Sequence, residues 1–442
     1  MDEDSCLHCF WQPVGFENQL PFYGFIAVEK RWCPVGQALK TLRSRIVLPL
    51  ATPPIEDGFV HLNAGRIVAV GRAREWAGGE VEDLGDSILM PGLINAHCHL
   101  DFTVMRGAIL QQDNFPNWVR RINDLKRTLS DEDYLRSISD GFAELRRWGT
   151  TSVFNIESFP ELMVRMPPPP MRAWWFYELI DVRNRIHTED VVAGALTFFD
   201  KHPNWMGGFG LSPHAPYTAS ATLYKLARFC CEKYAMPWTT HLAETEEEFE
   251  MFVRASGPLY QFLKELGRGM HDVGGITPVA RLFGDSVVPK GGILAHMNCL
   301  SDSDYKLLAS CARDIAVVHC PKCHQYFGRP SFELDRFRSA GVSVCLGTDS
   351  LASNTSLNLF EEMRQLRTNF PQISSPEILD MVTRRPARAI GLSGELGEIS
   401  AGAYADLIAV PYKGAAADAF EAVLDHSLPI TWVMVGGRDQ RT

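Results

Sequence analysis

The sequence predicts an α/β protein in which a (β/α)₈ barrel is joined to a small composite β-sandwich domain. Three observations support this fold class. Apolar strand-like runs alternate with amphipathic helical stretches through the middle of the chain. Alternating β-type runs stand at both ends of the chain. Polar clusters follow several apolar runs, as expected where barrel strands end at a common mouth.

The chain divides into three predicted parts, since its 442 residues exceed the roughly 250 of a single barrel. Residues 1–45 are an irregular, aromatic-rich extension without a predicted role, and Cys6 and Cys9 there form only an isolated C-x-x-C. Residues 46–88 and 393–442 form the β-sandwich, from "RIVLPLA", "GFVHLNAGRIVAVG", "GEISAGAYADLIAVPY" and "ITWVMVGG". Residues 89–392 form the barrel.

Eight apolar runs in the middle of the chain supply the predicted barrel strands. Their centres lie near Leu93, Val153, Trp175, Phe209, Thr239, Leu294, Val317 and Cys345. Helices are expected between most of them, for example over "DEDYLRSISDGFAELRRWG" and "SATLYKLARFCCEKYA", where apolar residues recur at three- and four-residue spacing. Gly149 and Gly341 are expected to end two such helices.

Composition excludes several classes of partner. The net charge is −10, and no Lys/Arg-rich run is present, which argues against nucleic acid or an anionic membrane surface. The N-terminus is acidic and lacks the apolar core of a signal peptide, and no segment has the apolar length of a transmembrane helix. Eleven irregularly spaced cysteines predict mostly reduced thiols. These features favour the cytoplasm.

Three histidines and one aspartate form the predicted metal site. In His97-Cys98-His99, alternate residues of a strand point to the same side, so both imidazoles can reach one metal. His241 ends "MPWTTH" and Asp349 closes "VCLGTDS", although Asp349 could instead cap the following helix. This ligand set suits one divalent metal with an open position for water. A second metal would need a bridging anion, such as a carboxylated lysine or a glutamate, on a middle strand. Glu178 is a possible bridge but is better explained as a substrate contact, so one metal is predicted.

Glu244 and His296 are the predicted catalytic residues. Glu244 lies three residues after His241 and could move a proton between water and a leaving amine. Alternatively, it only begins the acidic surface run 246–248. His296, after "GGILA", could polarise water or stabilise an oxyanion, unless it is a hydrogen-bonded core histidine.

Further polar and aromatic residues near these clusters are candidate substrate contacts. Each also has a structural explanation, such as a solvated arginine, a packed tryptophan or a zinc knuckle within "HCPKCH". The predicted substrate-binding residues are His214, Glu178, Arg106, Trp118, His324 and Ser350.

The segments "PGLINAHCHLD", "LSPHAPYT", "THLAETEEE", "LAHMNCL" and "LGTDSLASNTSLNLFEEMR" resemble the amidohydrolase superfamily, in its branch of metal-dependent deaminases and chlorohydrolases. The resemblance covers the chain from about residue 46 to its end. It implies zinc, or sometimes iron, at His97, His99, His241 and Asp349, with Glu244 and His296 catalytic. It also implies a homodimer, and release of ammonia when metal-bound hydroxide attacks an amidine-type ring carbon.

Two local features resemble the aminofutalosine deaminase-like branch, whose members serve menaquinone synthesis. The segment after H-x-H is short, and "HCPKCHQYFGR" replaces the "CPxSN" pattern usual in methylthioadenosine and adenosylhomocysteine deaminases. The expected reaction is therefore deamination of an adenine-type nucleoside. A guanine, cytosine, pterin or triazine ring or a cyclic amide is the alternative substrate, and a non-catalytic scaffold on the same fold is a further alternative.

Overall fold

The computed structural model describes residues 40–75, 80–182, 187–201, 205–284, 288 and 291–440. Most of the predicted extension, including Cys6 and Cys9, lies outside the described residues. The first strand, β1 (Lys40–Val47), begins six residues before the predicted start of the β-sandwich. All eight cysteines in the described part of the chain are free thiols. None of the helices in this part is long and apolar enough to cross a membrane.

Parallel strands form the barrel, and each strand except the two-residue β14 contains one of the eight predicted centres. In chain order they are β6 (Leu93–His99), β7 (Thr150–Glu157), β8 (Arg172–Leu179), β9 (Gly207–Pro213), β10 (Trp238–Leu242), β11 (Gly292–His296), β12 (Ile315–His319), β13 (Ser343–Leu346) and β14 (Asp349–Ser350). Every residue of β6 and β7 is buried, as expected for parallel strands covered on both faces.

The sheet closes on itself through an interrupted last strand. Neighbouring strands pair in chain order from β6 to β13, and β14 pairs with β6. Only Gly347 and Thr348 separate β13 from β14. A Cβ atom at Gly347 would lie 2.7 Å from the backbone oxygen of His97, so only glycine allows this close approach to β6. The predicted barrel is confirmed.

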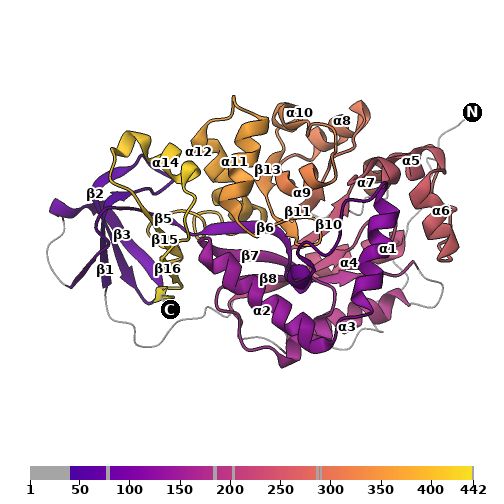
Figure 1. Ribbon diagram of the computed structural model, residues 1–442, viewed down its shortest axis with the longest axis horizontal. Coiled ribbons are helices and arrows are strands. Elements are labelled where there is room, and N and C mark those ends of the chain that lie inside the picture. The colour runs from indigo at the N-terminus through magenta and orange to yellow at the C-terminus, as the bar shows by residue number, and fades with distance from the viewer. Residues whose placement is uncertain are drawn as a thin grey trace, which may run out of the picture.

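Helices follow most barrel strands and cover the outside of the sheet (Figure 1). They are α1 (Phe115–Lys126), α2 (Asp131–Arg147), α3 (Thr188–Asp200), α4 (Ala221–Tyr234), α5 (Glu246–Arg254), α6 (Pro258–Glu265), α7 (Pro278–Gly284), α8 (Asp302–Ser310), α9 (Pro321–Tyr326), α10 (Leu334–Ser339), α11 (Leu359–Asn369), α12 (Ser375–Met381), α13 (Arg384–Ala389) and α14 (Ala419–Asp425). Four short 3₁₀ helices are η1 (Ala73–Glu75), η2 (Leu100–Met105), η3 (Pro160–Arg165) and η4 (Ala416–Asp418).

Local sequence explains where the predicted helices begin and end. A capping box formed by Ser130 and Asp133 starts α2, and Ser220 caps α4 by accepting a hydrogen bond from Leu223 N–H. Gly149 after α2 and Gly341 after α10 have φ angles of 73° and 72°, the left-handed conformation that glycine adopts without strain. The predicted helix ends at these two glycines are confirmed.

Both ends of the chain contribute to one small β domain, as predicted. Its strands are hydrogen-bonded into a single eight-stranded sheet with the order β17-β16-β15-β5-β1-β2-β3, and β4 pairs with β1. The remaining strands are β2 (Ile55–Asn63), β3 (Arg66–Arg72), β4 (Val81–Asp83), β5 (Ser87–Pro91), β15 (Leu407–Pro411), β16 (Trp432–Val435) and β17 (Arg438–Asp439). Figure 1 shows indigo and yellow strands side by side in this domain.

The β domain packs beside the ends where the barrel strands begin. Arg172, the first residue of β8, forms a buried ion pair with Asp406 at 2.6 Å, immediately before β15. Residues of β1 and β5, including Ile46 and Met90, share an apolar core with the barrel. The other ends of the barrel strands carry the predicted site and remain free of the β domain.

Candidate active site

The predicted metal ligands come from three separate strands and converge at one mouth of the barrel. His97 and His99 end β6, His241 lies in β10, and Asp349 begins β14. The His99 and His241 Nε2 atoms are 3.2 Å apart. The Asp349 Oδ1 atom lies 3.7 Å from His97 Nε2 and 3.8 Å from His99 Nε2. Barrel closure therefore brings together residues that are up to 252 positions apart in the sequence.

Their donor atoms fit a divalent cation. His97 is 1% exposed, yet among the described residues neither of its ring nitrogens has a hydrogen-bond partner. Buried nitrogens without partners are costly, by about 1–3 kcal/mol each, and a cation bound at Nε2, the nitrogen beside Asp349, would satisfy one of the two. Three imidazoles with one carboxylate are typical zinc ligands. Groups of ligand atoms within 4.8 Å of one another also include His97, His241 and His296, and Glu178, His214 and His241.

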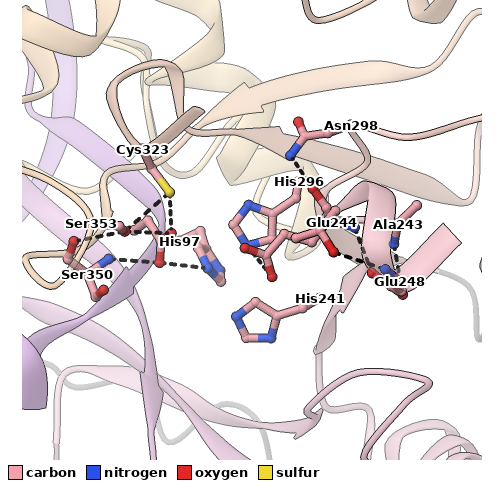
Figure 2. A network of polar contacts seen from close by, with 12 residues as sticks. His97, His241, Ala243, Glu244, Glu248, His296, Asn298, Cys323, Ser350 and Ser353 are labelled. Carbon is pink, nitrogen blue, oxygen red and sulfur yellow. Dashed lines mark hydrogen bonds and ion pairs between the residues drawn. The ribbon is translucent and has the colours of Figure 1, made fainter. Parts of the chain in front are cut away.

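Hydrogen bonds around the centre orient these ligands. The Nδ1 atom of His241 is 2.9 Å from the carbonyl oxygen of His214, so a proton on Nδ1 leaves Nε2 free to bind a metal. Ser350 N–H donates to Asp349 Oδ1 at 2.8 Å, and the Cys323 thiol donates to Asp349 Oδ2 at 2.8 Å. Figure 2 shows Cys323, Ser350 and Ser353 grouped on one side of His97. These hydrogen bonds therefore fix the orientation of His241 and Asp349.

Unusual backbone conformations occur where the strands meet the site. Ala243, His296, Met297 and Asp349 all have positive φ angles, between 49° and 74°, which are uncommon for residues other than glycine. Such conformations cost free energy and persist where the surrounding structure enforces them, often at functional sites. Here they turn the chain immediately after β10 and β11 and at the start of β14, and so aim side chains into the mouth.

Burial sets the charge of the imidazoles. It lowers the pKa of His99 and His296 well below the usual value, and it also lowers the pKa of His241. Burial by itself would raise the pKa of Asp349, but its contact with His97 and the nearby imidazoles hold that pKa well below the usual range. Neutral imidazoles beside an ionised carboxylate are the protonation states that metal binding requires.

Glu244 and His296 lie together beside this centre (Figure 2). The Oε2 atom of Glu244 is 3.9 Å from His296 Nε2, and both residues are buried. The Oε1 atom accepts a hydrogen bond from Arg329 Nη2 at 2.9 Å. Glu244 is 6% exposed, whereas Glu246 at the start of α5 is exposed, so Glu244 does not belong to the acidic surface of that helix.

A cavity of about 240 Å³ opens over these residues, between the barrel mouth and helices α1 and α6. Glu178, His214, Trp118 and Ser350, four of the predicted substrate contacts, line it. The His214 Nε2 atom lies 4.0 Å from Glu178 Oε1. Burial lowers the pKa of His214 to about 4, so this imidazole is neutral near pH 7.

The structure does not bring the other two predicted substrate contacts into the cavity wall. Arg106 is exposed, with 43% of its side chain accessible, and donates hydrogen bonds to Glu144 and to the Thr355 carbonyl oxygen. His324 is buried outside the cavity, with Nδ1 3.1 Å from Asn298 Oδ1 and Nε2 2.6 Å from the Pro330 carbonyl oxygen. A role for either residue in substrate binding stays a prediction, and their contacts here are structural.

Sequence reasoning missed several residues that surround the site. Lys126 at the end of α1 lines the cavity, Cys323 contacts Asp349, and Arg329 pairs with Glu244. Cys323 and Arg329 lie in "HCPKCHQYFGR", a segment noted in the sequence as a subfamily pattern and, in its first half, as a possible zinc knuckle. No spacing rule links these residues to Asp349 or Glu244, because the contacts depend on how α9 and the loop after it fold over the mouth.

Comparison with known proteins places this arrangement in a family. The model of the "Amidohydrolase family" matches residues 88–438. A 5-methylthioadenosine/S-adenosylhomocysteine deaminase of Pyrococcus furiosus is 30% identical over 368 residues, which cover 80% of each chain.

Two solved structures share the fold. An adenosine deaminase from Xanthomonas campestris with bound zinc has a TM-score of 0.75 at 24% identity, covering 91% of this chain and 92% of that one. An aminofutalosine deaminase of Helicobacter pylori, in complex with methylthio-coformycin, has a TM-score of 0.80 at 21% identity, covering 90% and 99%. The chain therefore belongs to the amidohydrolase family, as a hydrolase that acts on C–N bonds.

Proposed function

We propose that this chain is a metal-dependent aminohydrolase that deaminates an adenine-type nucleoside with release of ammonia. The observation that carries the proposal is the pairing of Glu244 with His296 beside the His97, His99, His241 and Asp349 donor set. The substrate class is supported by the Pyrococcus furiosus relative, which is named for two adenine nucleosides. Aminofutalosine is a candidate on the strength of "HCPKCHQYFGR" and the short segment after H-x-H.

The proposed metal centre uses one cation, with zinc preferred and iron the alternative. His97, His99, His241 and Asp349 would hold it. When bound, such a cation lowers the pKa of a water molecule and so supplies a nucleophile at neutral pH. The protein's own contribution is the neutral state of the buried imidazoles and the fixed orientation of His241 and Asp349.

In the proposed reaction, water adds to the ring carbon that bears the amino group: a C–O bond forms, the C=N π bond of the ring opens, and its electron pair moves to the ring nitrogen. Glu244 accepts a proton from that water through Oε2 and passes it to the ring nitrogen, and it then carries the remaining hydroxyl proton to the amino group. The C–N bond breaks, its electron pair leaves with ammonia, and the added oxygen becomes the carbonyl group of the ring. His296 would stabilise the charge that develops on the added oxygen. The 3.9 Å between Glu244 Oε2 and His296 Nε2 supports this joint role for the two groups.

The cavity would hold the substrate through its remaining wall. Its volume of about 240 Å³ is below the roughly 300–1,000 Å³ usual for small-molecule sites, so it favours one heterocycle with a modest substituent. Trp118 and Phe102 offer aromatic surface, while Glu178 and His214 offer hydrogen-bonding groups. We propose that these polar groups form hydrogen bonds with the edge of the substrate ring or with its ribose.

The test is ammonia release by protein whose zinc content has been measured. The panel contains adenosine, methylthioadenosine, adenosylhomocysteine, aminofutalosine, guanine and cytosine. Turnover of at least one adenine nucleoside, lost on chelation and restored by zinc, is the expected result. Turnover of guanine or cytosine alone would show that the protein is a deaminase of another substrate class. Zinc-loaded protein that releases ammonia from none of the six would refute the proposal.

A further inference from the structure

Arg329 is a buried cation that contacts the proposed proton carrier. Its side chain is 8% exposed, and its Nη2 atom lies 2.9 Å from Glu244 Oε1. The guanidinium also lies over the Phe327 ring, 4.3 Å from its centre. Its Nη1 atom is buried and has no hydrogen-bond partner among the described residues. The Glu244 contact is therefore the main compensation for bringing this charge out of water.

The rest of Glu244 is fixed as well. Its backbone N–H donates to Glu248 Oε2 at 2.7 Å, and its carbonyl oxygen accepts from Asn298 Nδ2 at 3.0 Å. Figure 2 shows Asn298 and Glu248 approaching Glu244 from different sides. With Oε1 committed to Arg329, the free oxygen is Oε2, which faces His296.

We propose that Arg329 is a positioning residue that ties down Oε1 of Glu244, so that Oε2 alone exchanges the proton during turnover. This inference rests on the proposed function. A hydrogen bond from a planar guanidinium fixes both the place and the plane of a carboxylate. Without it, Glu244 could rotate about its last side-chain bond, and the proton would reach the amino group in a smaller fraction of encounters.

The chain offers a matched control for the loss of a buried arginine. Arg172 is also buried and pairs with Asp406 at 2.6 Å, and its guanidinium lies 3.7 Å from the centre of the Tyr404 ring. It lies where β8 begins, at the end of the barrel opposite to the site. Arg172→Met therefore removes the same chemistry as Arg329→Met without touching Glu244.

The first experiment measures kcat, KM and zinc content for wild type, Arg329→Met, Arg329→Lys and Arg172→Met. We expect kcat of Arg329→Met to fall about 100-fold, as for loss of general acid–base catalysis. We expect KM to stay within about threefold and zinc content to be unchanged. Lysine should restore kcat by about tenfold, since it returns the charge and one donor. Arg172→Met should keep kcat while losing thermal stability.

Two results would overturn the inference. One is a kcat of Arg329→Met within about threefold of wild type. The other is a loss of kcat that lysine does not relieve and that follows the loss of zinc. Either would leave Arg329 as a counter-ion that serves stability alone.

If wild type releases no ammonia from the panel, the proposed function has failed, and a second measurement then tests separately whether Arg329 holds Glu244. The melting temperatures of Arg329→Met, Glu244→Gln and their double variant form a double-mutant cycle. If Arg329 holds Glu244, the second substitution costs much less melting temperature than it does in wild type. The same cycle with Arg172→Met should be additive. Additivity in the Arg329 cycle would overturn the inference.

Discussion

Glu244→Gln removes the proposed proton carrier while it preserves the size and shape of the side chain. The amide oxygen can still accept the hydrogen bond that Arg329 Nη2 donates at 2.9 Å. Glutamine cannot accept a proton from water near neutral pH, so proton transfer through the Oε2 position is lost. General acid–base catalysis contributes about 10²- to 10⁴-fold to rate. We therefore expect kcat to fall by that factor, or about 3–5 kcal/mol in the activation barrier.

The same structure limits the other effects of this substitution. Glu244 is outside the proposed ligand set, so zinc content should stay at the wild-type level. Both partners of the ion pair are buried, with side chains 7% and 8% exposed, so the loss of charge should cost stability. Removing one partner of a buried pair costs up to about 3–5 kcal/mol, and the retained hydrogen bond should keep the loss below that range.

The assay compares ammonia release with zinc content and melting temperature in the same preparations. Glu246→Gln is the matched control, because Glu246 begins the exposed face of α5 only two positions away. We expect this control to keep its rate. A near-normal rate in Glu244→Gln, at full zinc content, would show that another group carries the proton. An equal loss of rate in Glu246→Gln would show that the rate depends on the net negative charge of this region and not on Glu244 itself.

Three further predictions concern the metal centre and the domain contact. Asp349→Ala and His241→Ala should each lose bound zinc, as measured by metal analysis after gel filtration, whereas full zinc content would exclude these ligands. Cys323→Ala removes the thiol that donates to Asp349 Oδ2 at 2.8 Å. This variant should bind zinc about 10- to 100-fold more weakly in a chelator competition. Unchanged zinc affinity would show that this hydrogen bond does not support the Asp349 ligand. Asp406→Ala leaves Arg172 buried without its ion-pair partner. It should lower the free energy of unfolding by about 3–5 kcal/mol in urea denaturation. A loss below about 1 kcal/mol, as for an exposed ion pair, would contradict the burial of this pair.

Much of the fold could be predicted from the sequence because its elements depend on local patterns. Each of the eight apolar runs became a barrel strand, since short runs bounded by turns and separated by amphipathic helices favour parallel strands. Gly149 and Gly341 ended their helices because a left-handed residue suits glycine. One feature of the β domain could not be predicted, namely that its strands form one continuous sheet. That continuity depends on the pairing between β5 and β15, whose register the sequence does not display.

The candidate site shows the same division. His97, His99, His241, His296 and Asp349 could be selected from the sequence because each follows an apolar strand, and the ends of parallel strands share one mouth. That argument needs only the order of strands and the two-residue alternation of side chains.

What the tertiary structure alone decided is which residues outside the strand ends reach that mouth. His324 turned toward Asn298 and Pro330, whereas Cys323, from the same short helix α9, and Arg329, from the loop after it, reached Asp349 and Glu244. A six-residue helix and the loop after it are too short to show a periodic pattern, and their path is set by packing against distant segments. The sequence by itself therefore determined the barrel and its proposed ligands, while the tertiary structure determined how those ligands are held and which carboxylate oxygen of Glu244 remains free.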